Sequence, residues 1–435
     1  MSGVLTADHG DARLAARDRA LPGLATVLDD DAFAEVLAKR LPAVGIRRAR
    51  GTYARYKPGV SCLVAYRVEV SQPRDGAVAT TQVYARAQRP RDSAKLRKVQ
   101  WRATAPSVLG PGGLLVEELG LAVYAFPNDR RLPSLARLRG SVHREQLLKR
   151  LVPQEPALWR ASMRTLRYKP ERRYVAVLVA GDRPRALLKA YDDGFGGARR
   201  RAGALADALL PLPRVMGGSR RHRALVLEWL DGHSLDEALE TGTWSGAAVT
   251  NAAALLAALH SRRIDGLPAW SPTTEASRIR AAAQAVAATL PDLEAPTARL
   301  ARRLGGVMSE TNSSGRFIHA DFSADQVIFC RDSCSIIDLD SAMSGPPSCD
   351  LASFVARLER DVVSGRLTTE VAEAVRGEFL EAYAQAASTS VRLADRCVAA
   401  ALLRLAPEPF RRREPDWTER TEMMLDRVAE LAANG

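Results

Sequence analysis

The sequence predicts an α+β fold in which lobes built on antiparallel sheets precede a mainly helical lobe. Short runs of β-branched and aromatic residues, separated by turns, fill residues 51–126 and recur in the same order over residues 157–240. From Ser234 onward most apolar residues follow a helical spacing. One group of short strands interrupts these helices, at residues 317–340. These observations separate two strand-rich parts from a helix-rich part.

Length and composition limit the class of protein. A chain of 435 residues is too long for one ordinary core, so we expect two or three lobes. Its 46% hydrophobic and 26% charged residues are typical of a soluble globular protein. No apolar run of membrane-spanning length and no secretory signal are evident, so no membrane partner is expected. Five scattered cysteines, an odd number without framework spacing, favour reduced thiols and a cytoplasmic location.

The chain is strongly basic, with a formal net charge of +13 that comes mostly from arginine. The arginines are spread along the chain in short clusters, and no zinc-finger, RNP or helix-turn-helix signature accompanies them. A solvated basic surface therefore explains the charge better than a nucleic-acid site does. We expect no nucleic-acid partner, and we expect a monomer.

The first strand-rich part follows a helix that we predict after the aspartates at 29–31. Strands are predicted on both sides of the turn Lys57-Pro58-Gly59, followed by a third strand, a basic helix from Ser93 to Arg102 and a hairpin that ends at Phe126.

The second strand-rich part repeats the first. Arg167-Tyr168-Lys169-Pro170 copies Arg55-Tyr56-Lys57-Pro58, and the same order of strands follows each copy of this motif. Such self-similarity indicates an internal duplication of one lobe. The third strand of the second copy carries Lys189 where the first copy has Arg86.

Residues 317–352 contain the polar group on which the functional prediction depends. A short apolar run stops at His319, and a loop that contains Asp321 follows. The next strand begins at Gln326, turns, and returns toward Asp338. Asp321 and Asp338 are thereby expected at the same end of a small hairpin.

Phosphoryl transfer needs a base for the attacking hydroxyl, oxygen ligands for Mg²⁺ and cations near the phosphates. Asp321 is placed to be the base, and Gln326 and Asp338 offer the hard oxygen atoms that Mg²⁺ prefers. Asp340 follows Asp338 on the same side of a strand and is either a second metal ligand or a solvated turn residue. In the competing interpretation the aspartates only cap turns and His319 is structural; it accounts less well for Asp321 and Asp338.

The same stretch resembles the catalytic core of the aminoglycoside phosphotransferase and choline kinase superfamily. The family pattern is His-x-Asp, an Asn five residues after the Asp, an apolar strand ending Ile-Asp, and Gly-x-Pro-x-x-Asp-Leu-Ala. Here it reads His319-Ala320-Asp321, Gln326, Ile337-Asp338 and, from Gly345 to Ala352, GPPSCDLA. A Gln in place of this Asn is a feature in which the chain resembles the maltose kinases of the superfamily. The resemblance implies a bracing role for His319 and a loop-fixing role for Asp350.

A looser resemblance covers residues 157–405 and implies a protein-kinase-like two-lobe fold. Lys189 matches the strand lysine that contacts the α- and β-phosphates of ATP. The family hinge, which binds adenine through its backbone, is matched by Glu228, Trp229 and Leu230. A Gly-x-Ser-Leu motif begins two residues later, at Gly232.

Two departures from the family pattern concern the nucleotide lobe. Its lysine normally pairs with a helix Glu, yet residues 192–210 contain none, which leaves Asp193 or Asp207 as substitutes. The turn that follows Lys169 lacks the glycines of a phosphate-covering loop. Either Arg172 or Arg173 supplies charge there instead, or this is only a solvated turn.

We therefore expect an ATP- and Mg²⁺-dependent enzyme that moves the γ-phosphate to a hydroxyl of a small molecule, namely a sugar, aminosugar or aminoglycoside. The alternative is a nucleotide-binding pseudoenzyme that acts by binding or regulation. The expected domains are an N-terminal cap lobe at 1–140, a nucleotide-binding lobe at 141–233 and a helical catalytic lobe at 234–435.

Only the second copy of the duplicated lobe adjoins a catalytic half, so one ATP per chain is expected, bound through Lys189. The first copy is then either a cap on the substrate side or a packing module without substrate contact. On this interpretation, replacing Arg86 by Ala should leave ATP affinity nearly unchanged.

Overall fold

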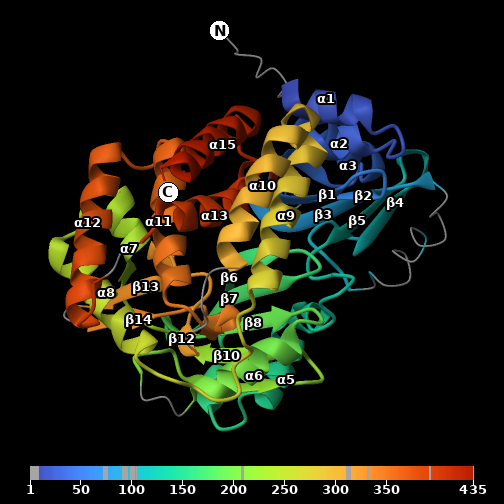
Figure 1. Ribbon diagram of the computed structural model, residues 1–435. Helices are drawn as coiled ribbons and strands as arrows, with labels where there is room; N and C mark the ends of the chain where they lie inside the picture. Colours follow the sequence, from blue (N-terminus) through green and yellow to red (C-terminus); the bar gives the residue numbers. More distant parts are fainter. Residues whose placement is uncertain are drawn as a thin grey trace. The chain divides into compact units, whose positions relative to one another are not determined.

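The fold is described from a computed structural model that covers residues 9–71, 77–90, 97, 103, 105–206, 210–309, 315–330, 333–390 and 393–434 (Figure 1). The chain divides into two compact units. The first contains Met1–Phe195, Met216–Leu227 and Pro409–Trp417, and the second contains Gly196–Val215, Glu228–Glu408 and Thr418–Gly435. The functional division at 140/141 and 233/234 remains a proposal.

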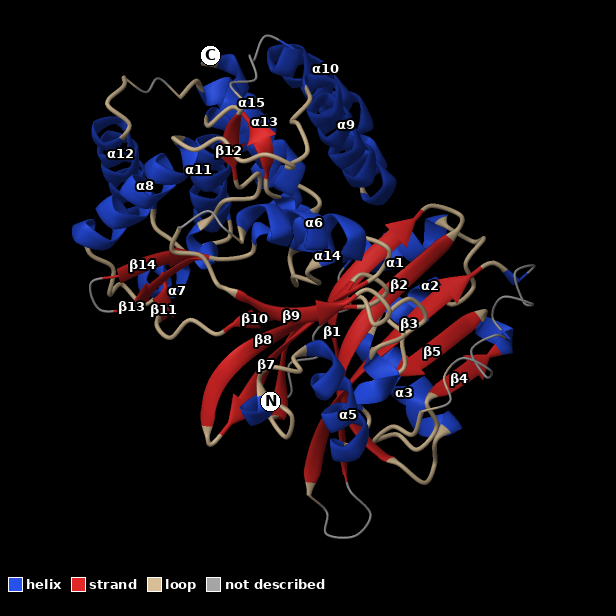
Figure 2. Cartoon of the chain, turned by 90° about the horizontal axis from the view of Figure 1, so that it is seen from below, coloured by secondary structure: helices blue, strands red, loops and turns tan. Residues whose placement is uncertain are grey.

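Two five-stranded sheets form the first unit (Figure 2). The first has the order β1-β2-β3-β5-β4 and consists of β1 (Gly45–Lys57), β2 (Ser61–Ser71), β3 (Val78–Gln88), β4 (Gly113–Val116) and β5 (Leu121–Ala125). The second has the order β6-β7-β8-β10-β9 and consists of β6 (Ser162–Lys169), β7 (Arg173–Ala180), β8 (Arg183–Tyr191), β9 (Val215–Ser219) and β10 (Ala224–Glu228). The identical order of strands confirms the predicted duplication.

The registers of the two sheets also agree. Leu63 on β2 pairs with Arg86 on β3. When the two Arg-Tyr-Lys-Pro motifs are aligned, Leu63 corresponds to Val175 on β7, and Val175 pairs with Lys189 on β8. Arg86 and Lys189 therefore occupy equivalent positions of the two copies, as the sequence predicted.

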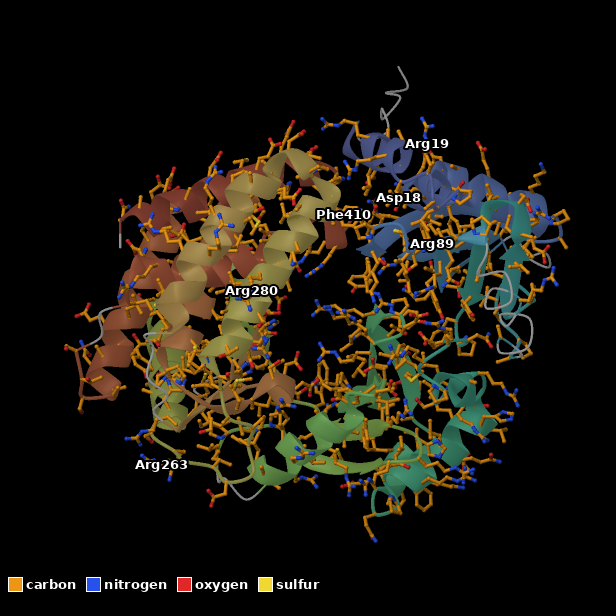
Figure 3. The ribbon with its side chains drawn as sticks, turned by 45° about the vertical axis from the view of Figure 1, so that its right-hand side comes forward. Asp18, Arg19, Arg89, Arg263, Arg280 and Phe410 are labelled. Carbon is orange, nitrogen blue, oxygen red and sulfur yellow. The ribbon has the colours of Figure 1, made fainter. Side chains whose placement is uncertain are left out.

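In each copy, an aspartate side chain accepts two hydrogen bonds from the turn between the first two strands and the strand before it. In the first copy, Asp18 Oδ2 accepts from the Tyr56 hydroxyl at 2.8 Å and from the Gly59 amide at 2.7 Å. Gly59 has φ +59°, and its carbonyl oxygen accepts from Arg89 Nε; Figure 3 labels Asp18 and Arg89. In the second copy, Asp129 Oδ2 accepts from the Tyr168 hydroxyl at 2.7 Å and from the Glu171 amide at 2.9 Å.

The duplication thus begins earlier in the chain than the strand pattern predicts. Asp18-Arg19-Ala20-Leu21-Pro22 and Asp129-Arg130-Arg131-Leu132-Pro133 share the pattern Asp-Arg-x-Leu-Pro. An 11-residue helix follows in each copy, α3 (Asp30–Arg40) in the first and α5 (Ser141–Leu151) in the second. Each repeat therefore comprises an aspartate that is hydrogen-bonded to the turn, a helix and a five-stranded sheet.

The N-terminal helices cover the first sheet. They are α1 (His9–Arg17), α2 (Leu24–Leu28) and α3, and α3 packs on β1. Asp29 caps α3, as predicted, because its side chain accepts from the amides of Asp31 and Ala32, both at 2.9 Å. Phe33 of α3 stacks on Tyr66 with ring centroids 3.9 Å apart. The basic helix predicted from Ser93 to Arg102 lies almost entirely outside the described residues.

The second unit is mainly helical. Its helices are α7 (Leu235–Glu240), α8 (Gly246–His260), α9 (Pro272–Thr289), α10 (Glu294–Ser309), α11 (Ser348–Val363), α12 (Thr369–Ala386), α13 (Asp395–Leu405) and most of α15 (Trp417–Ala433). Helix α10 continues through Gly305-Gly306 to Ser309. None of the described helices is long and apolar enough to cross a membrane.

Two small sheets carry the strands predicted in residues 317–340. One has the order β11 (His233–Ser234), β13 (Val327–Cys330), β14 (Ser333–Ile336), and the other pairs β12 (Arg316–Ile318) with β15 (Met343–Gly345). The loop after β12 is anchored by Phe322, which is fully buried next to Phe354 and Phe379 with ring centroids 5.8 and 6.1 Å away. The apolar core thus fixes the loop that carries Asp321.

Candidate active site

The loop after β12 is held by one buried carboxylate at the start of α11. Asp350 is 0% exposed, and its oxygens accept from the backbone amides of His319 at 2.6 Å and Ala320 at 2.7 Å. His260 Nε2 donates to the same carboxylate at 3.0 Å. Ala320 has φ +64°, a conformation that a residue with a Cβ rarely adopts. Asp350 therefore fixes the backbone immediately before Asp321, the role expected for it.

His319 connects three segments of the site. Its buried ring donates from Nε2 to the Ile337 carbonyl oxygen at 2.9 Å, and the Ile337 amide donates to the Gln326 carbonyl oxygen at 2.9 Å. Ile337 immediately precedes Asp338. Hydrogen bonds thus join the segments that carry Asp321, Gln326 and Asp338, and this geometry supports a bracing role for His319.

Asp321 extends from this fixed loop, with its side chain 44% exposed. Its Oδ1 accepts from Arg357 Nη2 at 2.5 Å. Arg357 is 14% exposed, and although burial lowers the pKa of its guanidinium, the charges of Asp321, Glu408 and Asp325 raise that pKa overall. An exposed carboxylate in a rigid loop, oriented by a buried guanidinium, can receive a proton from a bound hydroxyl.

Sequence reasoning missed Arg357, although a signal for it exists. Arg357 follows Asp350 by about two helical turns on α11, so both side chains lie on one face of the helix. The face that carries the loop-fixing Asp350 also carries the partner of Asp321.

Gln326 provides the oxygen that best fits a metal. Its side chain is 6% exposed, and Oε1 is buried without a hydrogen-bond partner among the residues that the structure describes. A buried amide oxygen without a partner is costly unless a donor or cation satisfies it. Mg²⁺ is such a cation, so Gln326 fits the predicted role.

The two aspartates after β14 complete the candidate metal ligands. Asp338 has φ +62° and ψ +48° and precedes a short 3₁₀ turn, a disfavoured conformation of the kind that clusters at functional sites. Asp340 lies within that turn. Burial lowers the pKa of the Arg201 guanidinium, and the negative charge of Asp340 offsets part of this lowering. The described residues contain no group of three His, Cys, Asp or Glu side chains arranged for a metal. A site formed by one amide and one carboxylate suits Mg²⁺, which takes few protein ligands.

The predicted phosphate-binding lysine belongs to the first unit. Lys189 lies on β8 and is 4% exposed. Neither proposed substitute for the helix Glu is shown to pair with it. Asp193 is exposed and forms ion pairs with Arg131 and, at 2.7 Å, with Arg223, and Asp207 lies outside the described residues.

The predicted adenine hinge begins at Glu228, the last residue of β10, and belongs to the second unit. The Glu228 amide donates to the Arg214 carbonyl oxygen at 2.9 Å, and Trp229 Nε1 donates to Asp231 Oδ1 at 3.0 Å, while Leu230 is half-buried. Gly232 has φ +136°, and a Cβ at this position would lie 1.9 Å from the Phe329 carbonyl oxygen. Only glycine therefore lets the chain leave the hinge and pair β11 with β13.

The chain is similar in sequence to one protein family and in fold to several solved structures. The model of the phosphotransferase enzyme family (APH) matches residues 170–397, more than half of the chain. No curated protein sequence matches the chain. A choline kinase from Cryptosporidium parvum Iowa II superposes with a TM-score of 0.47 at 12% identity, over 66% of this chain and 94% of that chain.

Two solved aminoglycoside phosphotransferases are also similar. A thermostable mutant of APH(4)-Ia in its apo form has a TM-score of 0.44 and 18% identity, over 63% of this chain and 94% of that chain. The gentamicin complex of APH(2'')-IIa has a TM-score of 0.43 and 14% identity, over 66% of this chain and 95% of that chain.

Proposed function

Because the chain belongs to the phosphotransferase enzyme family, we propose that it transfers the γ-phosphate of ATP to a hydroxyl of a small molecule. The predicted α+β fold is confirmed by the antiparallel sheets and the helices of the structure, and the chain carries an additional N-terminal sheet. The protein-kinase-like arrangement of lobes is part of the proposal. The observation that carries the proposal is the exposed Asp321 in a loop whose backbone amides are fixed by the buried Asp350. The proposed acceptor is a sugar, an aminosugar or an aminoglycoside.

In this proposal Asp321 orients the acceptor hydroxyl and receives its proton, while Arg357 and His319 hold the loop in place. Lys189 contacts the α- and β-phosphates, and the backbone of Glu228 to Leu230 binds adenine. Gln326 and Asp338 would hold Mg²⁺, with Asp340 as a candidate further ligand. When bound, Mg²⁺ supplies neutralisation of the phosphate charge.

The remaining parts of the proposal concern the protein as a whole. The lobe at 1–140 is proposed as a cap, the lobe at 141–233 as the nucleotide-binding lobe and the lobe at 234–435 as the catalytic lobe. A cytoplasmic location is proposed from the odd number of scattered cysteines, and a monomer is proposed as well.

The decisive experiment incubates the full chain with ATP, MgCl₂ and a panel of sugars, aminosugars, aminoglycosides and amino alcohols, and measures ADP. Formation of ADP that depends on one acceptor class supports transfer and names that class. ATP binding without ADP formation for any acceptor supports the alternative, a pseudoenzyme that acts by binding.

Replacing Lys189 by Ala is expected to weaken ATP binding by about 10- to 100-fold, since a hydrogen bond to a charged group contributes about 1.5–3 kcal/mol. Titration calorimetry with Mg·ATP measures the effect. Lys149→Ala is the control, because Lys149 lies on α5 and pairs with Glu145 at 2.7 Å. Equal ATP affinity of wild type and the Lys189 variant would exclude this lysine from the site.

Replacing Arg357 by Gln is expected to lower kcat by about tenfold with little change in the KM for ATP, because the buried partner that orients Asp321 is lost. Arg357→Lys should retain part of the rate. Arg278→Gln, which alters an arginine paired with Glu275 on α9, is the control and should be neutral. A kcat of Arg357→Gln within twofold of wild type would show that Asp321 needs no such partner.

A further inference from the structure

Glu171 occupies an unusual position in the turn between β6 and β7. It directly follows the second Arg-Tyr-Lys-Pro motif, as Gly59 follows the first. The two residues have nearly the same left-handed backbone, φ +61° for Glu171 and φ +59° for Gly59. Glycine adopts this conformation readily, whereas a residue with a Cβ does not. The second copy thus has a glutamate at a turn position that favours glycine. We therefore expect the Glu171 side chain to make contacts that offset this backbone conformation.

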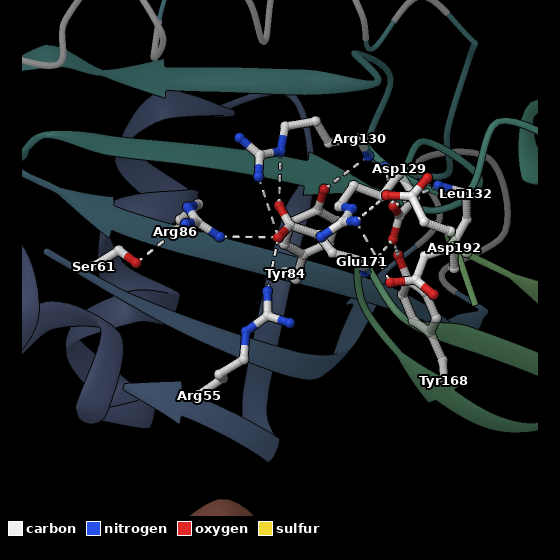
Figure 4. A network of polar contacts seen from close by, with 12 residues as sticks. Arg55, Ser61, Tyr84, Arg86, Asp129, Arg130, Leu132, Tyr168, Glu171 and Asp192 are labelled. Carbon is white, nitrogen blue, oxygen red and sulfur yellow. Dashed lines mark hydrogen bonds and ion pairs between the residues drawn. The ribbon is translucent and has the colours of Figure 1, made fainter. Parts of the chain in front are cut away.

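The Glu171 carboxylate is buried among three arginines that all precede the second sheet in sequence (Figure 4). Arg55 Nη2 of β1 lies 2.7 Å from Oε2, Arg86 Nη1 of β3 lies 2.9 Å from Oε2, and Arg130 Nε lies 3.0 Å from Oε1. The Glu171 side chain is only 1% exposed, so these ion pairs are largely shielded from water.

Arg86 makes this contact informative. It is the first-copy equivalent of Lys189, the residue proposed to contact nucleotide phosphates in the second copy. The Glu171 carboxylate is therefore the anion held by the third-strand cation of the first copy. This explains physically why the first copy should offer no second nucleotide site.

The turn lies where the resembling family has its phosphate-covering loop, although it lacks the glycines of that loop. Asp129 Oδ2 holds its backbone through the Glu171 amide at 2.9 Å, and the Arg172 amide closes the turn on the Lys169 carbonyl oxygen at 3.1 Å. The turn is therefore attached to the N-terminal lobe by both its backbone and its side chain.

We propose that Glu171 is a positioning residue through which the N-terminal sheet holds the β6–β7 turn in the conformation that binds ATP. This inference rests on the proposed function, because it concerns the same nucleotide site. It assigns to the first copy a role in nucleotide binding without contact to the nucleotide. It also replaces the expectation that an Arg86 substitution leaves ATP affinity unchanged.

The test measures Mg·ATP affinity of the full chain by calorimetry and amide hydrogen exchange of the turn at residues 169–173. Glu171→Gln and Arg86→Gln are each expected to lower ATP affinity by about tenfold and to speed exchange in the turn. Arg86→Lys, which keeps the charge, should restore part of the affinity. In the double variant the losses should be less than additive, because one ion pair is removed twice.

Two further variants separate the ion pairs from other effects. Glu171→Gly keeps a residue suited to the left-handed turn but removes the carboxylate, so it should lose ATP affinity as Glu171→Gln does. Glu145→Gln removes a carboxylate that pairs with Lys149 on α5, and it should leave both readouts unchanged.

Unchanged ATP affinity in a folded Glu171→Gln variant, with or without faster exchange in the turn, would overturn the positioning role and leave the proposed function standing. Failure of the wild-type chain to bind Mg·ATP would instead overturn the proposed function, and this inference with it. The two failures are distinguishable because the second appears without any substitution.

Discussion

Replacing Asp321 by Asn is expected to lower the rate of phosphoryl transfer by about 10²- to 10⁴-fold, the usual contribution of a general base. Asn cannot take the proton of the acceptor hydroxyl, yet its oxygen can still accept from Arg357. The loop should also keep its shape, because the amides of His319 and Ala320 are held by Asp350. Folding and ATP affinity should therefore remain close to those of wild type.

The matched control is Asp325→Asn. Asp325 is an exposed aspartate later in the same loop, and its carboxylate accepts from the Ser323 hydroxyl. Single-turnover rates with saturating ATP and the acceptor found by screening compare the two variants. Near-normal turnover of Asp321→Asn would remove Asp321 from its proposed role, whereas an equal loss in both variants would indicate damage to the loop rather than loss of a base.

The local part of the site was predictable because its residues lie close together in sequence. His319, Asp321, Gln326 and Asp338 belong to one loop and the hairpin that follows it. The pairing of β13 with β14 brings the two ends of that hairpin, which carry Gln326 and Asp338, together. The fixing of the loop by Asp350 was expected from the family pattern and is seen directly in two backbone hydrogen bonds. The proposed chemical roles of these residues remain predictions.

Contacts between distant segments were not predictable in the same way. The partner of Asp321 comes from the middle of α11, and its identity depends on how that helix packs against the loop. The partners of Glu171 come from residues up to 116 positions away. The sequence did contain the repeated Asp-Arg-x-Leu-Pro pattern, but this short motif is separated from the more obvious strand repeat by helices.

The return of the chain near its C-terminus was also missed. Residues Pro409–Trp417 belong to the first unit although they follow the helical lobe in sequence. Arg413 explains the attachment, since its guanidinium donates to Asp11 at 2.6 Å and to the Leu28 carbonyl oxygen at 2.6 Å. Burial lowers the pKa of the Arg413 guanidinium, but the hydrogen bond to Asp11 and the charge of its carboxylate raise this pKa overall. The buried arginine therefore stays charged. No local pattern in residues 409–417 indicates such a partner.

The second large effect is expected at Asp338. Asp338→Ala should lower kcat/KM by about 10³-fold and remove most of the Mg²⁺ dependence of nucleotide binding, since a metal ion stabilises phosphoryl transfer by several kcal/mol. Alanine offers no ligand, and Gln326 alone supplies a neutral oxygen. Calorimetric titration with ATP, with and without MgCl₂, measures the effect directly.

Substitutions at Gln326 and Asp340 test whether this effect comes from the metal. Gln326→Asn keeps an amide oxygen and should be tolerated, whereas Gln326→Leu should weaken Mg²⁺-dependent binding, because the buried oxygen that lacks a partner in the described residues is then absent. Asp340→Ala decides between the two interpretations of that residue: a loss comparable to that of Asp338→Ala identifies a second ligand, and a small change identifies a turn residue. Equal Mg·ATP affinity of wild type and Asp338→Ala would place the metal elsewhere.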